Sequence, residues 1–198
     1  MRGRSDPAAA LLSGVQNADA PPRMNVFLVG PMGSGKSAVG RQLAQRLALE
    51  FIDSDAEIEA RTGVDIAYIF EREGEAGFRS REAEVIDALS RREGVLVSTG
   101  GGAILEASTR ERLRARGRVV YLRTSVDQQL ARTRRSALRP LLLNPDPRGT
   151  LERLMAQRAA LYEEVADVIV DTDGRKVGSV VNEILRRLEH ERSERCSD

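Results

Sequence analysis

The fold is decided by residues 30–37, which read Gly30-Pro31-Met32-Gly33-Ser34-Gly35-Lys36-Ser37. This octet follows the apolar run VFLV at residues 26–29 and precedes an amphipathic stretch, so it lies between an expected strand and an expected helix. Glycines at these spacings let the backbone turn tightly and present its N–H groups to phosphate oxygens, and the helix N-terminus adds positive potential. The lysine can reach the β- and γ-phosphates of a nucleotide, and the serine hydroxyl can bind Mg²⁺. The octet therefore predicts a phosphate-binding P-loop rather than a glycine-rich turn that matches by chance.

The composition indicates one globular domain without a strong overall charge. The chain has 198 residues, 41% of them hydrophobic, which is enough to build a core. Its formal net charge of +1 gives no general attraction to nucleic acid or to a membrane, so we expect neither as a partner. The single cysteine, Cys196, excludes an internal disulfide framework and suits a reducing cytoplasm. The single histidine, His190, gives almost no support to histidine catalysis or to a histidine-based metal site.

Short apolar runs alternate with helical patterns along the chain. They lie at residues 26–29, 51–52, 95–97, 119–122 and 168–170. This alternation is typical of a parallel sheet with helices on both faces. No stretch approaches the roughly 20 apolar residues of a membrane span. We expect residues 1–23 to form a disordered extension and residues 191–198 a frayed tail, because neither segment carries sustained apolar periodicity.

An arginine- and proline-rich segment interrupts the alternation at residues 132–148. Such a segment is unsuited to a core, and a solvated surface loop is one interpretation. Because the P-loop supplies a polyphosphate that needs cationic cover, we favour a mobile lid.

Two carboxylates follow the second expected strand, in the sequence FIDSD at residues 51–55. Ligands bind at the carboxyl ends of parallel strands, which places Asp53 to hold Mg²⁺ through water. Asp55 is then placed to accept a hydrogen bond from a substrate hydroxyl. Alternatively, Ser54 or Asp55 only caps the helix that follows.

Two further segments carry patterns that allow a binding role. The stretch 74–82, GEAGFRSRE, is expected to begin a helix with Arg79 and Glu82 on one face, although a surface ion pair explains that spacing equally well. The run STGGG at residues 98–102 places glycines directly after a strand. Such a run indicates close approach of the backbone to a bound group, or else a flexible turn.

Together these motifs resemble those of the shikimate kinases, over residues 24–190. The matching motifs are GPMGSGKS, FIDSD, GEAGFRSRE, STGGG, Arg132 followed by RPLL at 139–142, and RAALY at 158–162. The resemblance implies an α/β, nucleoside monophosphate kinase-like P-loop NTPase fold, with a five-stranded parallel sheet in the order 2-3-1-4-5 flanked by helices. It also implies a substrate-binding subdomain over about residues 54–81 and a mobile lid over about 133–147.

The resemblance also assigns roles, residue by residue. ATP would be bound by Gly33, Ser34, Gly35, Lys36, Ser37, Ala38, Arg132, Arg139 and Arg175. Shikimate would be bound by Asp55, Phe70, Phe78, Arg79, Glu82, Gly100, Gly101, Gly102 and Arg158, with Glu82 orienting the substrate arginine. Mg²⁺ would be held by Ser37 and, through water, by Asp53. The catalytic residues would be Lys36, Asp55 and Arg139.

One loop departs from the family pattern. Family members often carry a proline after the last strand, where this chain reads DGRKVG at residues 173–178. That loop contacts adenine in the family, so the sequence leaves the adenine contacts, including that of Arg175, open.

The sequence thus predicts an ATP-dependent kinase that phosphorylates the 3-hydroxyl of shikimate, as a cytoplasmic monomer. Planar guanidinium groups at Arg79 and Arg158 suit a small carboxylate, whereas a gluconate kinase would not need two of them. A nucleoside monophosphate kinase needs room for a second base, and the segment between Asp55 and Arg79 is short. The remaining alternative is a nucleotide-dependent switch or a non-catalytic binding module. No Asn-Lys-x-Asp guanine motif occurs in the sequence, and the P-loop lysine and the aspartates of FIDSD are present.

Overall fold

A parallel sheet forms the centre of the computed structural model, which describes residues 24–133 and 145–195. Within these ranges the sheet has five strands, β1 (Val26–Val29), β2 (Glu50–Asp53), β3 (Val95–Ser98), β4 (Arg118–Arg123) and β5 (Val168–Asp171). Their order is β2-β3-β1-β4-β5, and all neighbouring strands are parallel. Each expected apolar run forms a strand, and the predicted P-loop fold with its strand order is confirmed.

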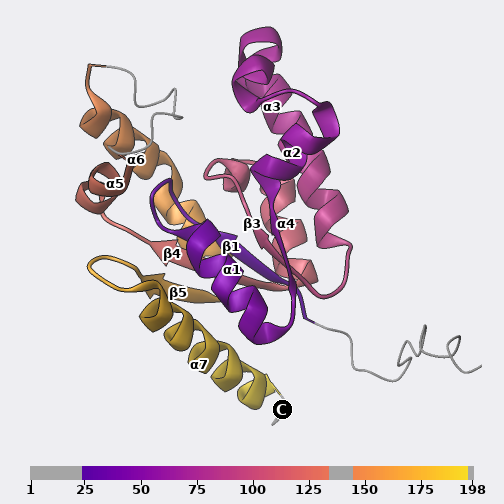
Figure 1. The fold of residues 1–198 in the computed structure, drawn as a ribbon, viewed down its shortest axis with the longest axis vertical. Coiled ribbons are helices and arrows are strands. Elements are labelled where there is room, and N and C mark those ends of the chain that lie inside the picture. Colours follow the sequence, from indigo (N-terminus) through magenta and orange to yellow (C-terminus); the bar gives the residue numbers. More distant parts are fainter. Residues whose placement is uncertain (1–23, 134–144, 196–198) are drawn as a thin grey trace, which may run out of the picture.

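Helices cover both faces of the sheet, as Figure 1 shows. They are α1 (Lys36–Leu47), α2 (Ser54–Thr62), α3 (Ile66–Ser90), α4 (Ala107–Arg116), α5 (Val126–Thr133), α6 (Pro147–Val165) and α7 (Val177–Arg195), with a 3₁₀ helix, η2 (Ala103–Leu105), before α4. Helix α7 continues into the segment 191–198 that we expected to be a frayed tail. In the part of the chain that the structure describes, no helix is long and apolar enough to cross a membrane.

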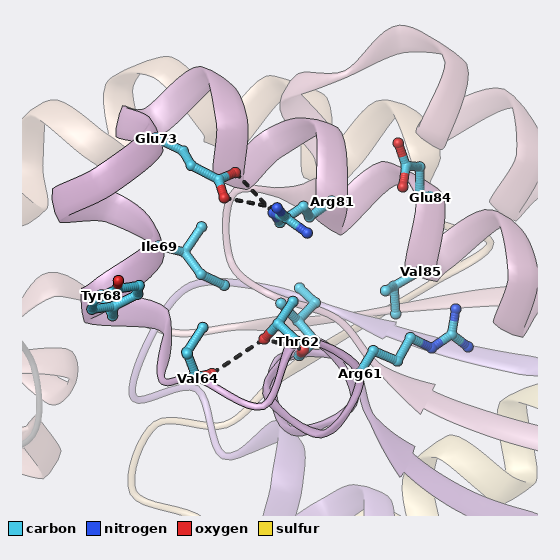
Figure 2. Close-up of a pocket in the computed structure, with 10 residues that line it drawn as sticks. Arg61, Thr62, Val64, Tyr68, Ile69, Glu73, Arg81, Glu84 and Val85 are labelled. Carbon is cyan, nitrogen blue, oxygen red and sulfur yellow. Dashed lines mark hydrogen bonds and ion pairs between the residues drawn. The ribbon is translucent and has the colours of Figure 1, made fainter.

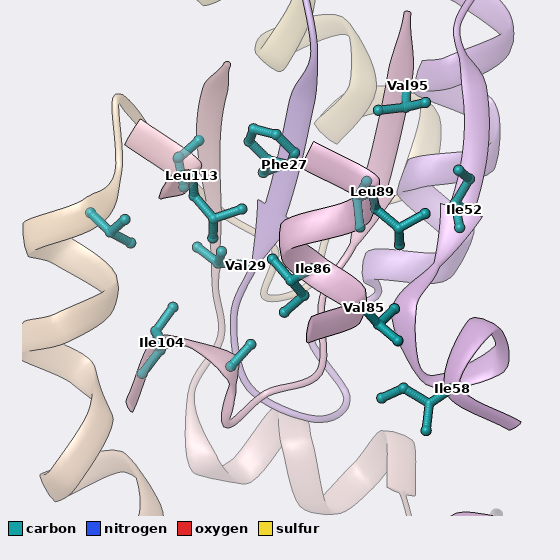
Figure 3. Packing of buried hydrophobic residues seen from close by; sticks show 14 of the residues in the cluster. Phe27, Val29, Ile52, Ile58, Val85, Ile86, Leu89, Val95, Ile104 and Leu113 are labelled. Atoms are coloured by element: carbon teal, nitrogen blue, oxygen red, sulfur yellow. The ribbon is translucent and has the colours of Figure 1, made fainter. Parts of the chain in front are cut away.

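The central strand β1 shows how the sequence divides the core in two. Its side chains are fully buried and point alternately to opposite faces of the sheet. Phe27 and Val29 join the apolar cluster formed with α3 and α4, which Figure 3 shows. Val26 and Leu28 join a second cluster, formed with α1 and α7. A strand covered on both faces therefore needs a continuous apolar run, and VFLV provides it.

Helix α3 consists of two helical parts that meet at Gly74. The sequence predicted that a helix begins in the stretch 74–82, and the helical part that follows Gly74 agrees with this prediction. The sequence analysis did not predict the helical part before Gly74, which starts at Ile66, where Asp65 accepts a hydrogen bond from the backbone N–H of Tyr68. Gly74 interrupts the helix with φ 70° and ψ −174°, a conformation open to glycine but strained for other residues. Helix α3 packs against α2, and it adds residues to the core from both sides of the kink, Ile69 before it and Phe78 and Val85 after it. Figure 1 shows α2 and this first part of α3 projecting together beyond the sheet.

Candidate active site

The predicted P-loop lies between the carboxyl end of β1 and the start of α1. Gly35 caps α1 with φ 95°, and Gly33 has φ 76°, both in the left-handed region that favours glycine. Lys36 Nζ donates to the backbone carbonyls of Gly30 at 2.7 Å and Pro31 at 2.9 Å. The ammonium group therefore lies against the loop at a helix N-terminus, and both features favour a bound polyphosphate.

The other predicted P-loop residues lie in the same turn. Ser34 is buried within the loop, whereas Ser37 and Ala38 are exposed in the first turn of α1. The hydroxyl of Ser37 donates to Asp53 Oδ2 at 2.9 Å, which joins the P-loop to the end of β2. The sequence prediction that these two side chains lie together is therefore supported by the geometry.

Asp53 also begins helix α2. Its Oδ1 accepts from the backbone N–H of Asp55 at 3.2 Å, so Asp53 is the N-cap. The alternative that Ser54 or Asp55 caps this helix is wrong, because both lie in its first turn. The side chain of Asp55 is therefore not used in capping.

A hydroxyl and a carboxylate are hard oxygen ligands, so the pair of Ser37 and Asp53 fits Mg²⁺. Mg²⁺ keeps several waters and takes few protein ligands when substrate phosphates supply others. Among the described residues no group of three or more His, Cys, Asp or Glu side chains is arranged to hold a metal. The donor set thus suits a metal shared with a nucleotide rather than a closed protein cage.

Four charged side chains gather around glycines 100–102. Each has a buried polar atom without a hydrogen-bond partner among the described residues: Asp55 Oδ1, Arg79 Nε, Glu82 Oε1 and Arg158 Nε. Leaving one such atom unpaired costs on the order of 1–3 kcal/mol. Four together indicate a ligand site, because buried polar groups elsewhere in proteins are almost always paired.

Arg79 is held by acidic side chains of its own helix. Its Nη1 donates to Glu82 Oε2 at 2.6 Å, and its Nη2 donates to Glu75 Oε1 at 3.2 Å. Glu82 is 2% exposed, so the interpretation of this spacing as a surface ion pair is wrong. Burial raises the pKa of the Glu82 carboxyl, and Arg79 partly opposes that rise. The guanidinium carbon lies 5.2 Å from the ring centroid of Phe78, which stacks on Phe70 at 4.7 Å.

The glycine run is fixed by side chains from two helices. The N–H of Gly100 donates to Ser54 Oγ at 3.0 Å. The carbonyl of Gly101 accepts from Tyr162 Oη at 2.5 Å and from Arg158 Nη1 at 3.5 Å. A Cβ at Gly102 would overlap the guanidinium of Arg79. These contacts favour close approach of the backbone to charged groups over a flexible turn.

Arg132 joins two loops on the nucleotide side of the sheet. Its Nη1 donates to the Gly33 carbonyl at 2.9 Å, and its Nη2 donates to the Thr172 carbonyl at 2.7 Å. The guanidinium therefore lies at the P-loop, as expected of a residue near the phosphates.

Arg175 lies against α7 instead. It pairs with Glu183 Oε2 at 2.6 Å and donates to the Ser179 carbonyl at 3.1 Å, which leaves its predicted contact with the nucleotide a prediction. Arg139, with most of the expected lid over 133–147, lies outside the described residues.

The sequence analysis missed two residues that hold the glycine run in place. Ser54 was considered only as a helix cap, yet its hydroxyl holds Gly100. Tyr162 is fully buried and holds Gly101. The available signal for Tyr162 was its position four residues after Arg158, which places both side chains on one face of α6.

A separate groove of about 510 Å³ lies between α2 and α3, and Figure 2 shows its walls. Arg81 crosses it to form two hydrogen bonds with Glu73, at 2.7 and 2.8 Å. The groove is lined by none of the residues that the sequence assigned to the site. The charged cluster around glycines 100–102, rather than this groove, is therefore the candidate acceptor site.

A P-loop beside a second, buried cluster of charged side chains at the same end of the sheet is typical of a small-molecule kinase of the P-loop class. The chain belongs to the shikimate kinase family, whose family model matches residues 32–189. The shikimate kinase of Alteromonas mediterranea is 55% identical over 166 residues, which cover 84% of this chain and 97% of that relative. The shikimate kinase of Halorhodospira halophila is 59% identical over 164 residues, which cover 83% of this chain and 93% of that relative.

Solved structures lead to the same family. A shikimate kinase from Acinetobacter baumannii, solved in complex with shikimate, superposes with a TM-score of 0.83 at 47% identity, covering 85% of this chain and 94% of that one. A gluconokinase from Sinorhizobium meliloti has a TM-score of 0.60 at 23% identity, covering 86% of this chain and 94% of that one. At that identity the likeness shows the shared fold alone.

Proposed function

We propose that this chain transfers the γ-phosphoryl group of ATP to the 3-hydroxyl of shikimate, giving shikimate 3-phosphate and ADP. The observation that carries the proposal is the set of unpaired buried atoms on Arg79, Arg158 and Asp55, which faces one run of glycines. Guanidinium groups grip a carboxylate, and an unpaired carboxylate oxygen accepts from a hydroxyl. The shikimate-bound structure of a relative supports the same acceptor.

On the acceptor side, Arg79 and Arg158 hold the carboxylate of shikimate, and Asp55 orients the hydroxyl that attacks. Burial and the charge of Asp53 raise the pKa of the Asp55 carboxyl, while Lys36 and Arg79 oppose that rise. A raised pKa makes Asp55 a better proton acceptor once the new P–O bond has begun to form. Because phosphoryl transfer depends mainly on alignment and charge stabilisation, orientation by Asp55 comes first and proton removal late.

On the donor side, the P-loop N–H groups and Lys36 bind the phosphates of ATP and stabilise the charge that moves toward the β-phosphate. Ser37 and, through water, Asp53 would hold Mg²⁺, which would supply a further positive charge to the phosphates. We propose Arg139 as an additional lid cation and Arg132 as a contact near the P-loop. We further propose that the protein works as a monomer in the cytoplasm.

An ADP-release assay tests this function directly. Mg²⁺-ATP is supplied with shikimate and, in parallel, with quinate, gluconate or AMP. We expect ADP formation to depend on shikimate and to be absent with gluconate and AMP. ATP binding without turnover of shikimate would contradict the proposal and move the chain to another acceptor or to a non-catalytic role.

The glycine run allows a matched comparison of two alanine variants. A Cβ at Gly100 would overlap Glu82 Oε1 and stand 2.9 Å from Asp55 Oδ1, whereas at Gly101 the nearest atom would be 3.5 Å away. We expect Gly100→Ala to lower kcat/KM for shikimate by about tenfold or more, and Gly101→Ala by less than about threefold, since overpacking costs about 1–3 kcal/mol. Steady-state kinetics of both variants decide the point. Equal losses in the two would mean that the glycine run does not pack on these carboxylates.

A further inference from the structure

Tyr162 lies in the last turn of α6 and contacts the glycine run at residues 100–102. Its side chain is fully buried, and its ring stacks on that of Tyr121 in β4, with centroids 4.9 Å apart and planes inclined by 20°. The stacked pair fixes the direction of the Tyr162 hydroxyl, which donates to the Gly101 carbonyl at 2.5 Å. Burial raises the pKa of Tyr162, so this hydroxyl stays protonated and remains a donor throughout the neutral range.

Arg158 donates a longer hydrogen bond to the same carbonyl. Its Nη1 lies 3.5 Å from the Gly101 oxygen, at the outer limit of a hydrogen bond, while the Tyr162 hydroxyl lies 1 Å closer. The two donors come from one face of α6, a turn apart. Without the hydroxyl, this carbonyl would keep the long hydrogen bond from Arg158, and we expect the guanidinium to move closer to it.

We propose that Tyr162 is a positioning residue: its hydroxyl makes the short hydrogen bond to the Gly101 carbonyl and so keeps the Arg158 guanidinium at the longer distance of 3.5 Å, where it can bind the carboxylate of the acceptor. This inference rests on the proposed function, because it assigns that carboxylate to Arg158. Bidentate binding of a carboxylate needs both guanidinium nitrogens at fixed positions. A guanidinium drawn toward Gly101 would lose that geometry, and the loss would fall on shikimate rather than on ATP.

The test compares Tyr162→Phe with Tyr121→Phe in the full chain. Each variant removes one hydroxyl from the same stacked pair, and the Tyr121 hydroxyl donates to none of the glycines 100–102 in the described part of the chain. We expect Tyr162→Phe to raise KM and the calorimetric Kd for shikimate by about tenfold, the upper range for one hydrogen bond, with kcat and the KM for ATP within about threefold. Tyr121→Phe should leave all of these constants within about twofold of wild type.

A double-variant cycle shows whether Tyr162 acts through Arg158. We expect Tyr162→Phe to change shikimate binding by less than about threefold when Arg158 is already lysine, because a lysine has no planar fork for the hydroxyl to protect. The same tenfold loss in that background would overturn the inference. Equal changes in shikimate binding in Tyr162→Phe and Tyr121→Phe would also overturn it. So would a loss of ATP affinity in Tyr162→Phe as large as its loss of shikimate affinity, accompanied by a fall in melting temperature. A wild-type chain that does not phosphorylate shikimate would instead contradict the proposed function.

Discussion

Replacing Lys36 by methionine is expected to lower the turnover of shikimate by about 10³-fold or more. The ammonium lies against the P-loop carbonyls at the start of α1, where the phosphates of ATP are proposed to bind. A charged donor aimed at developing charge in a partly buried site contributes on the order of 10²–10³ in rate or more, because no solvent must reorganise around it. Methionine keeps much of the length of the side chain and removes the charge.

The fold should survive this substitution. Helix α1 starts at the left-handed Gly35, and the loop is also held by Arg132 through the Gly33 carbonyl, a hydrogen bond that the substitution leaves in place. We therefore expect a melting temperature within a few degrees of wild type. Arg46→Met is the matched control, since it removes a positive charge from the exposed last turn of the same helix. ADP release and thermal melting are measured for both variants, and Lys36→Met with more than a tenth of wild-type turnover would remove Lys36 from the chemistry.

The fold was predictable because its signals are local. A strand buried on both faces needs a continuous apolar run, and a P-loop needs its glycines and lysine at fixed spacing. The strand order is different in kind. The strand order depends on how the connecting helices cross from one strand to the next, and no hydrophobic periodicity in the sequence encodes it. We predicted this order from the family resemblance.

The first part of α3 shows what the local signals did not reveal. Gly74 interrupts the helical geometry just before the part of α3 that carries Arg79, as the sequence indicated, but a further helical part precedes it. The apolar residues before the kink include Tyr68 and Phe70, which are exposed. Apolar residues in this part therefore do not all lie on one buried face, and the helical periodicity of the sequence is weak there. The sequence signal for the start of α3 was Asp65, because aspartate is a preferred N-cap residue, and in the structure it caps the helix.

The sequence allowed us to predict contacts between side chains of complementary charge, but not the burial of those side chains or their contacts with the backbone. The spacing of Arg79 and Glu82 places them on one face of a helix, but burial of the pair depends on packing against the glycine run. Tyr162 was harder to assign because its partner is a backbone carbonyl 61 positions away. A carbonyl is the same in every residue, so the sequence holds no sign of which one is used.

Replacing Asp55 by asparagine is expected to lower turnover by at least about 10²-fold, the scale of a positioned acid–base or hydrogen-bonding group. Asparagine has nearly the same shape, but it carries no negative charge and cannot take the proton of the attacking hydroxyl. In the wild type, kcat/KM should fall as pH falls through the pKa of Asp55, which burial and Asp53 raise. That acid-side fall should be absent in the variant. A variant with near-full activity would exclude Asp55 from the reaction.

The same substitution should stabilise the fold at neutral pH. Because the folded-state pKa of Asp55 lies above its unfolded value, the native state disfavours the ionised carboxylate. Wild-type stability from this group is complete below the unfolded pKa and is lost as pH rises through the folded pKa. Asparagine does not ionise, so Asp55→Asn should melt at a higher temperature than wild type near pH 7, and the gap should narrow near pH 4.

Glu57→Gln is the matched control, because it removes a carboxylate from the same turn of α2, and this carboxylate forms an ion pair with Arg61 at the surface. We expect this control to change turnover by less than about twofold and to show no gain in melting temperature, since exposed ion pairs contribute only about 0–1 kcal/mol. A gain in stability together with a loss of turnover in Asp55→Asn would mean that the buried charge is kept for catalysis at a cost to the fold. A drop in both would show instead that Asp55 supports the structure of α2, and its role in the reaction would have to be given up.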